Sequence, residues 1–88
     1  MRHAINLDRQ PEKFLEDLSA GISQRIINKL EGAFENSLYP KGSIKIKGQE
    51  NIYRMRVGNY RILYRVIKNE LRIFVFKIEH RNNVYKSL

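Results

Sequence analysis

Cysteine is missing from this 88-residue sequence, and its absence removes several classes of protein at once. Without thiols, a chain cannot form a disulfide framework, a thiolate zinc site or a cysteine nucleophile. Long apolar runs are missing as well. No segment approaches the roughly 20 apolar residues that span a bilayer, and the first residues contain no apolar stretch of signal-peptide length. We therefore expect a cytoplasmic protein that has no membrane partner.

The chain is also too short for two cores. Its 88 residues, of which 42% are hydrophobic, predict one domain over residues 1–88. A domain of this size buries a modest share of its surface, so the free energy of folding is limited. An obligate protein partner would fit such a chain.

Acidic residues are scarce in the second half of the sequence. Residues 1–40 carry five basic and six acidic side chains, whereas residues 41–88 carry twelve basic and three acidic ones. The second half alone therefore has a net charge of +9. Such a surface attracts a polyanion such as nucleic acid, with an affinity that falls as salt rises. The alternative is that these side chains only solvate the surface.

Hydrophobic periodicity predicts an α+β fold. We expect an N-terminal strand, a two-helix hairpin and a three-stranded antiparallel meander, with both helices packed on one face of the sheet. Pro11 suits the first turn of the first helix, because its missing N–H is not needed there. The expected strands are residues 2–7, 52–57, 60–67 and 71–78, and the expected helices are residues 11–18 and 22–36. A long loop from residue 36 to residue 51 connects the second helix to the strand at 52–57, and it contains a short extended piece at 43–47.

The hairpin around Gly58 and Asn59 gives the clearest local prediction. If these two residues form the turn, Val57 pairs with Tyr60 and Arg56 pairs with Arg61. One side of the hairpin then faces the helices, and the other side is basic. The helix side carries Tyr53, Met55, Val57, Tyr60, Ile62 and Tyr64, and the basic side carries Arg54, Arg56, Arg61 and Arg65.

The register of the last strand depends on the next turn. A three-residue loop at 68–70 would place Ile67 opposite Leu71 and Arg61 opposite Lys77. Phe74, Phe76 and Ile78 would then join the core, and Lys77 would join the arginines. A slip of one residue would reverse the faces of this strand.

Arginines gathered on one face predict a phosphate-binding site. Like charges opposite each other destabilise a sheet by a few tenths to about 1 kcal/mol, so stability alone does not favour Arg56 opposite Arg61. Guanidinium groups bind phosphate oxygens through paired, charge-assisted hydrogen bonds. The alternative is that exposed strand positions merely tolerate arginine, with the side-chain stems lying over apolar neighbours.

Two segments resemble the signature of RelE-type toxins from toxin–antitoxin modules. They are YRMRVGNYRILYRV, from Tyr53 to Val66, and FKIEHRNNVYK, from Phe76 to Lys86. The resemblance to this RelE/ParE superfamily covers essentially the whole chain and implies the RelE-like fold. It also implies a metal-independent endoribonuclease (mRNA interferase) without a small-molecule cofactor, which binds the ribosome, cuts mRNA in the A site and inhibits translation. The RNA 2′-hydroxyl would be the nucleophile.

The same resemblance implies which residues act. The basic strand positions of the family match Arg54 and Arg56, the arginine after the hairpin turn matches Arg61, and the C-terminal pair matches Arg81 and Tyr85. We expect Arg56 and Arg61 to stabilise charge on the phosphate, Arg81 to act at the leaving group, and Tyr85 to stack on or orient a base.

The proton acceptor is harder to identify. Relatives have lysines where this chain has Arg54 and Arg56, and arginine gives up a proton poorly. His80 is our candidate, because imidazole titrates near neutrality, although a surface histidine before a turn is an equal alternative. His3 is expected to be structural. Further contacts with the RNA backbone are expected from Lys45, Lys47, Arg65 and Lys77.

Two other functions fit the same residues. A ParE-like toxin would inhibit DNA gyrase without cutting RNA, and the two branches share one fold, so the fold does not separate them. An inactive RNA-binding relative is the other possibility, because no base is obvious. In each toxin reading, the resemblance implies a cognate antitoxin that covers the basic face.

Overall fold

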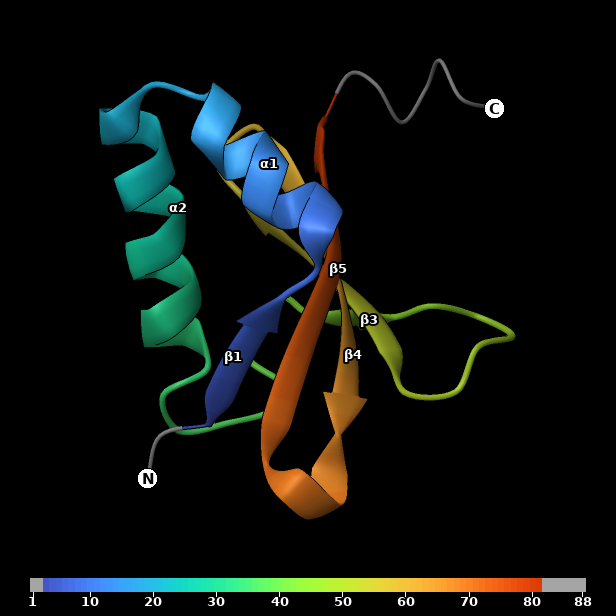
Figure 1. Ribbon diagram of the computed structural model, residues 1–88. Coiled ribbons are helices and arrows are strands. Elements are labelled where there is room, and N and C mark those ends of the chain that lie inside the picture. Colours follow the sequence, from blue (N-terminus) through green and yellow to red (C-terminus); the bar gives the residue numbers. More distant parts are fainter. Residues whose placement is uncertain (1–2, 82–88) are drawn as a thin grey trace.

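The computed structural model describes residues 3–81 and forms a five-stranded sheet with two helices on one of its faces (Figure 1). Its strand order is β1-β5-β4-β3-β2, in which β1 runs parallel to β5 and the other neighbours are antiparallel. The elements are β1 (Ala4–Leu7), α1 (Arg9–Asp17), α2 (Ala20–Ala33), β2 (Ile44–Lys45), β3 (Ile52–Val57), β4 (Tyr60–Ile67), the 3-10 turn η1 (Lys68–Glu70) and β5 (Arg72–His80). The expected α+β fold is confirmed.

Both helices begin two residues before their predicted starts because a capping side chain precedes each of them. The Asp8 carboxylate accepts a hydrogen bond from the backbone N–H of Arg9, at 2.8 Å, and Pro11 remains within the first turn of α1. The Ser19 hydroxyl accepts from the N–H of Ile22 in the same way at the start of α2. Such caps satisfy donors that have no partner inside the helix.

The core lies between the helices and the sheet. Ile26 and Leu30 of α2 and its C-cap residue Phe34 pack with Leu15 of α1 against the covered face. The Phe34 and Tyr64 rings meet edge to face, with their centroids 4.9 Å apart. His3 supports the same region, because its Nδ1 hydrogen-bonds to the Phe34 carbonyl oxygen at 2.9 Å. Within residues 3–81, no helix is long and apolar enough to cross a bilayer.

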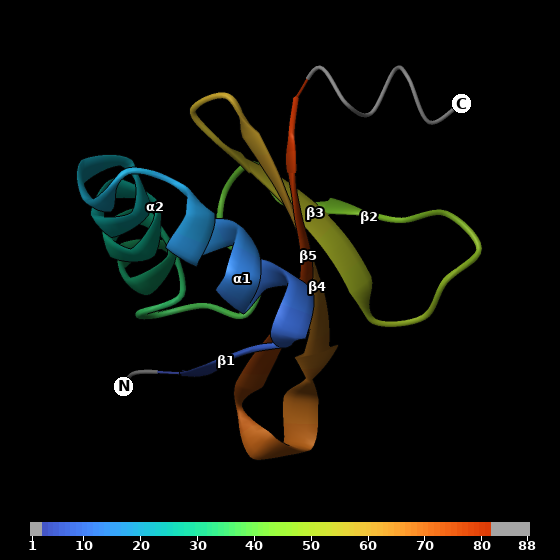
Figure 2. The ribbon, with the colours of Figure 1, turned by 45° about the horizontal axis from the view of Figure 1, so that its top comes forward.

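The predicted β3–β4 hairpin is confirmed residue by residue. Val57 pairs with Tyr60, and Arg56 pairs with Arg61. Gly58 has a φ of 58°, which glycine adopts at little cost and which tightens the turn. The two faces separate as expected: Met55, Val57, Ile62 and Tyr64 are buried in the core. Figure 2 shows both helices on one side of the sheet, which leaves the opposite face without a helical layer.

The predicted register between β4 and β5 is wrong by one residue at its start. Leu71 adopts a left-handed conformation with a φ of 50° and extends the turn, so that Arg72 rather than Leu71 lies opposite Ile67. Phe74 therefore pairs with Arg65 on the open face instead of entering the core. This is the reversal that a one-residue slip produces in a strand.

A β-bulge then moves the register by one more residue. Beyond the Leu63/Tyr64 irregularity, Leu63 pairs with Lys77 and Arg61 pairs with Glu79, so Phe76 has no place in the ladder and stays half-buried. Because the two shifts together equal two residues, Lys77 still lies on the arginine side, as predicted. The buried side chains of β5 are Ile73, Val75 and Ile78, so the core prediction was right for Ile78 and wrong for Phe74 and Phe76.

Candidate nucleic-acid interface

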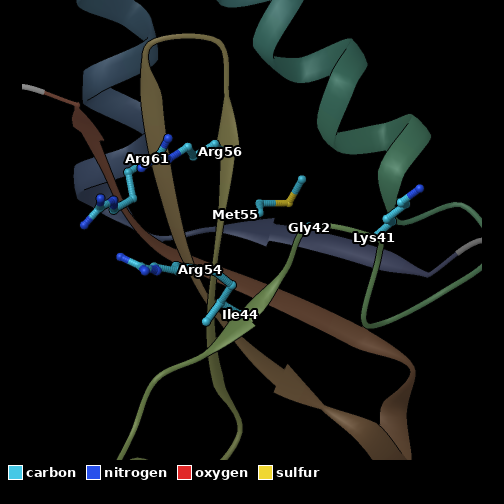
Figure 3. A pocket seen from close by; sticks show the side chains of 7 residues that line it. All are labelled: Lys41, Gly42, Ile44, Arg54, Met55, Arg56 and Arg61. Carbon is cyan, nitrogen blue, oxygen red and sulfur yellow. The ribbon is translucent and has the colours of Figure 1, made fainter.

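Three arginines gather on the open face of the β3–β4 hairpin. The register places Arg56 opposite Arg61 and Arg54 opposite Leu63, in the neighbouring row of the same face. Figure 3 shows the three arginine side chains extending to the same side of the hairpin, whereas Met55 points the other way. The alternation of side chains along a strand is the cause, because residues two apart share a face.

A pocket of about 370 Å³ lies beside these arginines. Its lining residues come from β3, β4, the edge strand β2 and the loop before it: Lys41, Gly42, Ile44, Arg54, Met55, Arg56 and Arg61. Ile44 pairs with Arg54 and so brings an apolar side chain to the basic face. Lys41 was missed by sequence reasoning, because only the folded loop brings it to β3.

The pocket arginines form no ion pairs within the described part of the chain. None of Arg54, Arg56 and Arg61 makes an ion pair or a side-chain hydrogen bond there. Directly opposed like charges weaken a sheet. A bound anion would relieve this repulsion, and guanidinium groups suit the oxygens of a phosphate.

Three other cations predicted to act on RNA, Arg65, Lys77 and Arg81, lie outside the pocket lining. The backbone N–H of Arg81 donates to the carbonyl oxygen of Asn59 at 2.7 Å, which holds Arg81 at the turn end of the hairpin, the end where Arg56 and Arg61 lie. Arg65 and Lys77 occupy the open face but do not line the pocket. Lys77 forms an ion pair with Glu79 at 3.0 Å.

Two lysines of the long loop do not join the arginines. Lys45 pairs with Tyr53 and therefore lies on the side of β3 away from Arg54. Neither Lys45 nor Lys47 lines the pocket, although both are exposed. Their contact with the RNA backbone remains a prediction.

His80 lies on the other side of the sheet from Arg61. It pairs with Tyr60, and the two rings meet edge to face with centroids 5.4 Å apart. Our hypothesis that His80 is the proton acceptor requires the imidazole to lie on the arginine face. The structure does not bring it there. Tyr85, predicted to contact a base, lies outside the described residues. Residues 3–81 contain no group of three or more His, Asp or Glu side chains that could hold a metal ion.

The tyrosines of the hairpin belong to the core side, as predicted. Tyr64 is fully buried, and Tyr53 stacks on it with a centroid distance of 5.8 Å. Tyr39, which is 42% exposed, covers Tyr53 from outside. Burial raises the pKa of the Tyr64 hydroxyl above its ordinary value of 10.0, against a smaller lowering by nearby Ser43.

Comparison with known proteins identifies the family. The model of the family "ParE toxin of type II toxin-antitoxin system, parDE" matches residues 5–85. A chain in the crystal structure of the RelB-RelE antitoxin-toxin complex from Methanococcus jannaschii is 30% identical, with a TM-score of 0.71 over 94% of this chain and 98% of that one.

Two further relatives agree with this match. The Methanocaldococcus jannaschii protein named RelE1 is 27% identical over 90 residues, which cover 99% of each chain. The isolated RelE toxin of E. coli has the same fold at 21% identity, with a TM-score of 0.74 over 97% of this chain and 93% of that one. This chain therefore belongs to the RelE/ParE superfamily of toxins from type II toxin–antitoxin systems.

Proposed function

We propose that this toxin is a ribosome-dependent endoribonuclease that cuts messenger RNA in the A site and so inhibits translation. The observation that carries the proposal is the gathering of Arg54, Arg56 and Arg61 at one pocket of the β3–β4 hairpin, where none of them forms an ion pair within the described residues. A volume of about 370 Å³ falls within the range of small-ligand sites and can receive a phosphate with its sugar.

The proposed reaction is attack of the RNA 2′-hydroxyl on the neighbouring phosphate. It needs a base for the hydroxyl proton, cations for the charge that develops on phosphorus, and a proton for the leaving 5′-oxygen. Arg56 and Arg61 would hold the phosphate, assisted by Arg54. Arg81 would act at the leaving group, and Tyr85 would orient a base. The products are a 2′,3′-cyclic phosphate and a 5′-hydroxyl end.

A cognate antitoxin is the second part of the proposal. RelE chains are found with RelB in the complexes from Methanococcus jannaschii and Pyrococcus horikoshii. In this chain, the basic face and the short edge strand β2 present both charge and unpaired backbone groups to an acidic partner. We propose that the antitoxin covers the pocket and that the free toxin acts in the cytoplasm.

Primer extension on messenger RNA in programmed ribosomes tests the nuclease directly. The wild type should produce a cut in the A-site codon, and Arg81→Ala should reduce cutting by about 100-fold if it serves the leaving group. A 2′-deoxy nucleotide at the cut site should abolish cleavage, because the nucleophile is then missing.

Gyrase inhibition is the competing function, and the match to the ParE family model favours testing it. A supercoiling assay with purified gyrase should show no effect of the toxin. Inhibition of supercoiling by a folded protein that leaves ribosome-bound messenger RNA intact would replace the nuclease with a gyrase inhibitor. Binding of RNA without either activity would indicate an inactive relative.

A further inference from the structure

Glu79 is the single acidic residue within β3, β4 and β5. The β-bulge places it directly opposite Arg61, which in turn lies opposite Arg56. Directly opposed residues share a face, with Cβ atoms about 5 Å apart. A carboxylate and two guanidinium groups therefore form one row across three strands of the open face.

The Glu79 carboxylate is held in place and mostly covered. Its Oε1 lies 3.0 Å from the Lys77 Nζ, and its side chain is 15% exposed, against 50% for Lys77. Its second oxygen makes no hydrogen bond or ion pair within residues 3–81. One oxygen is thus anchored, and the other is unpaired. Glu79 does not line the pocket itself, but Arg61, which does, is its cross-strand neighbour.

A carboxylate opposite Arg61 has a structural role, because opposite charges across two strands stabilise a sheet and Lys77 forms an ion pair with it, but the same carboxylate lies on a phosphate-binding face. It would repel the phosphate that the arginines attract, and an ion pair across the strands to Arg61 is not formed within the described residues. The neighbouring cations are poor proton acceptors, because arginine and lysine are protonated at neutral pH. The carboxylate is the one group in this row that can accept a proton.

We propose that Glu79 is the proton acceptor of the reaction, an inference that rests on the nuclease function proposed above. The unanchored oxygen takes the proton of the 2′-hydroxyl while O2′ forms its bond to phosphorus. The bond between phosphorus and the 5′-oxygen breaks, and that oxygen takes a proton from solvent water. Glu79 then returns its proton to solvent. Arg61, its cross-strand neighbour, holds the phosphate beside it.

Single-turnover cleavage of ribosome-bound messenger RNA by Glu79→Gln tests this role. Glutamine keeps the size and hydrogen-bonding capacity of the side chain but cannot take the proton, so cleavage should slow by about 10²- to 10⁴-fold. Binding of toxin to the ribosome, measured separately, should be unchanged or tighter, because a negative charge has been removed from a phosphate-binding face. Lys77→Met is the matched control. It breaks the same ion pair but keeps the carboxylate, and it also removes an expected contact with the RNA backbone. Its cleavage should therefore slow by only a few fold, far less than that of Glu79→Gln.

The outcomes separate this inference from the proposed function. If the wild type cuts and Glu79→Gln cuts at a similar rate, Glu79 is not the proton acceptor, and the nuclease stands. If Lys77→Met and Glu79→Gln lose activity equally, the ion pair serves only to shape the site. If the wild type does not cut, both proposals fail. Should Glu79→Gln not fold by circular dichroism, Glu79→Ala and Glu79→Asp replace it. Glu79→Asp keeps the carboxylate and should cut faster than Glu79→Ala, and equal rates would remove Glu79 from the reaction.

Discussion

Among single residues, the arginines of β4 offer a matched comparison. Arg61 lines the pocket, whereas Arg65 lies on the same face outside it. We predict that Arg61→Ala slows cleavage by about 10²- to 10³-fold, the usual cost of losing one group that stabilises developing charge. Arg65→Ala should change the rate by only a few fold, because its contact is with the RNA backbone at most. Single-turnover rates on programmed ribosomes measure both.

The two substitutions remove the same charge from the same strand. Equal losses in both variants would mean that the whole basic face, rather than the pocket, supports the reaction. Stability should not confuse the result, because both side chains are directed away from the core.

Tyr64 leads to a prediction about stability. Its hydroxyl is fully buried close to the Ser43 side chain, but the geometry of a hydrogen bond is not met within the described residues. An unsatisfied buried polar group is costly, so Tyr64→Phe should leave the free energy of unfolding unchanged or raise it by about 1 kcal/mol. Urea denaturation at neutral pH measures the difference. A large loss of stability would show that the hydroxyl has a partner after all.

The same residue predicts how stability depends on alkaline pH. The folded-state pKa of Tyr64 is raised above 10.0 because burial disfavours the phenolate. An acid whose pKa is higher in the folded state contributes stability that is complete below the unfolded pKa and is lost as pH rises through the folded pKa. Wild-type stability should therefore fall above about pH 10, and it should fall less steeply in Tyr64→Phe. Unfolding curves across that range test the difference.

At the level of elements, the two turns of the meander both contain a residue with a positive φ, but only one of these residues is glycine. Gly58 has a φ of 58°, and glycine adopts it freely, whereas Leu71 holds a φ of 50° with a full side chain. We predict that Gly58→Val destabilises the fold by about 1–3 kcal/mol and that Leu71→Gly stabilises it by up to about 1 kcal/mol. Urea midpoints of the two variants provide the measurement. Stabilisation by Gly58→Val would contradict the turn geometry.

The bulge in β5 connects the fold to the site. Without it, the register that starts at Arg72 would place Lys77 opposite Ile62 and direct it into the core. With it, Lys77 and Glu79 lie opposite Leu63 and Arg61, on the open face. Bulges often re-aim side chains near active sites in this way. One extra residue in a strand is thus what brings a carboxylate to the arginine row.

For the whole molecule, the segregation of charge predicts the salt dependence of RNA binding. Each contact with a single-stranded phosphate contributes about −0.7 to the slope of log affinity against log salt. Three pocket arginines predict a slope of about −2 or steeper, measured by fluorescence anisotropy with a short RNA. Arg56→Ala should make the slope shallower by about 0.7. Lys29→Ala, an exposed change on α2 at the helical side, should leave the slope unaltered.

The α+β class, the β3–β4 hairpin and the gathering of Arg54, Arg56 and Arg61 on one face could all be predicted from the amino-acid sequence. These features depend on local rules: apolar periodicity, a glycine-containing turn and the alternation of side chains along a strand. Helix starts were missed by two residues, because Asp8 and Ser19 each cap a helix before its first apolar residue. The family was recognised separately, from the resemblance of residues 53–66 and 76–86 to the signature of RelE-type toxins.

The register of β5, the position of His80 and the residues that complete the pocket could not be predicted without the folded structure. A left-handed Leu71 and a bulge near Phe76 are not signalled by residue type, because both arise where β5 must satisfy β4 on one side and β1 on the other. Lys41 reaches the pocket lining through a long loop, and Glu79 reaches the arginine row through two register shifts. Both depend on contacts between residues far apart in the chain, which a pattern read along one strand does not contain.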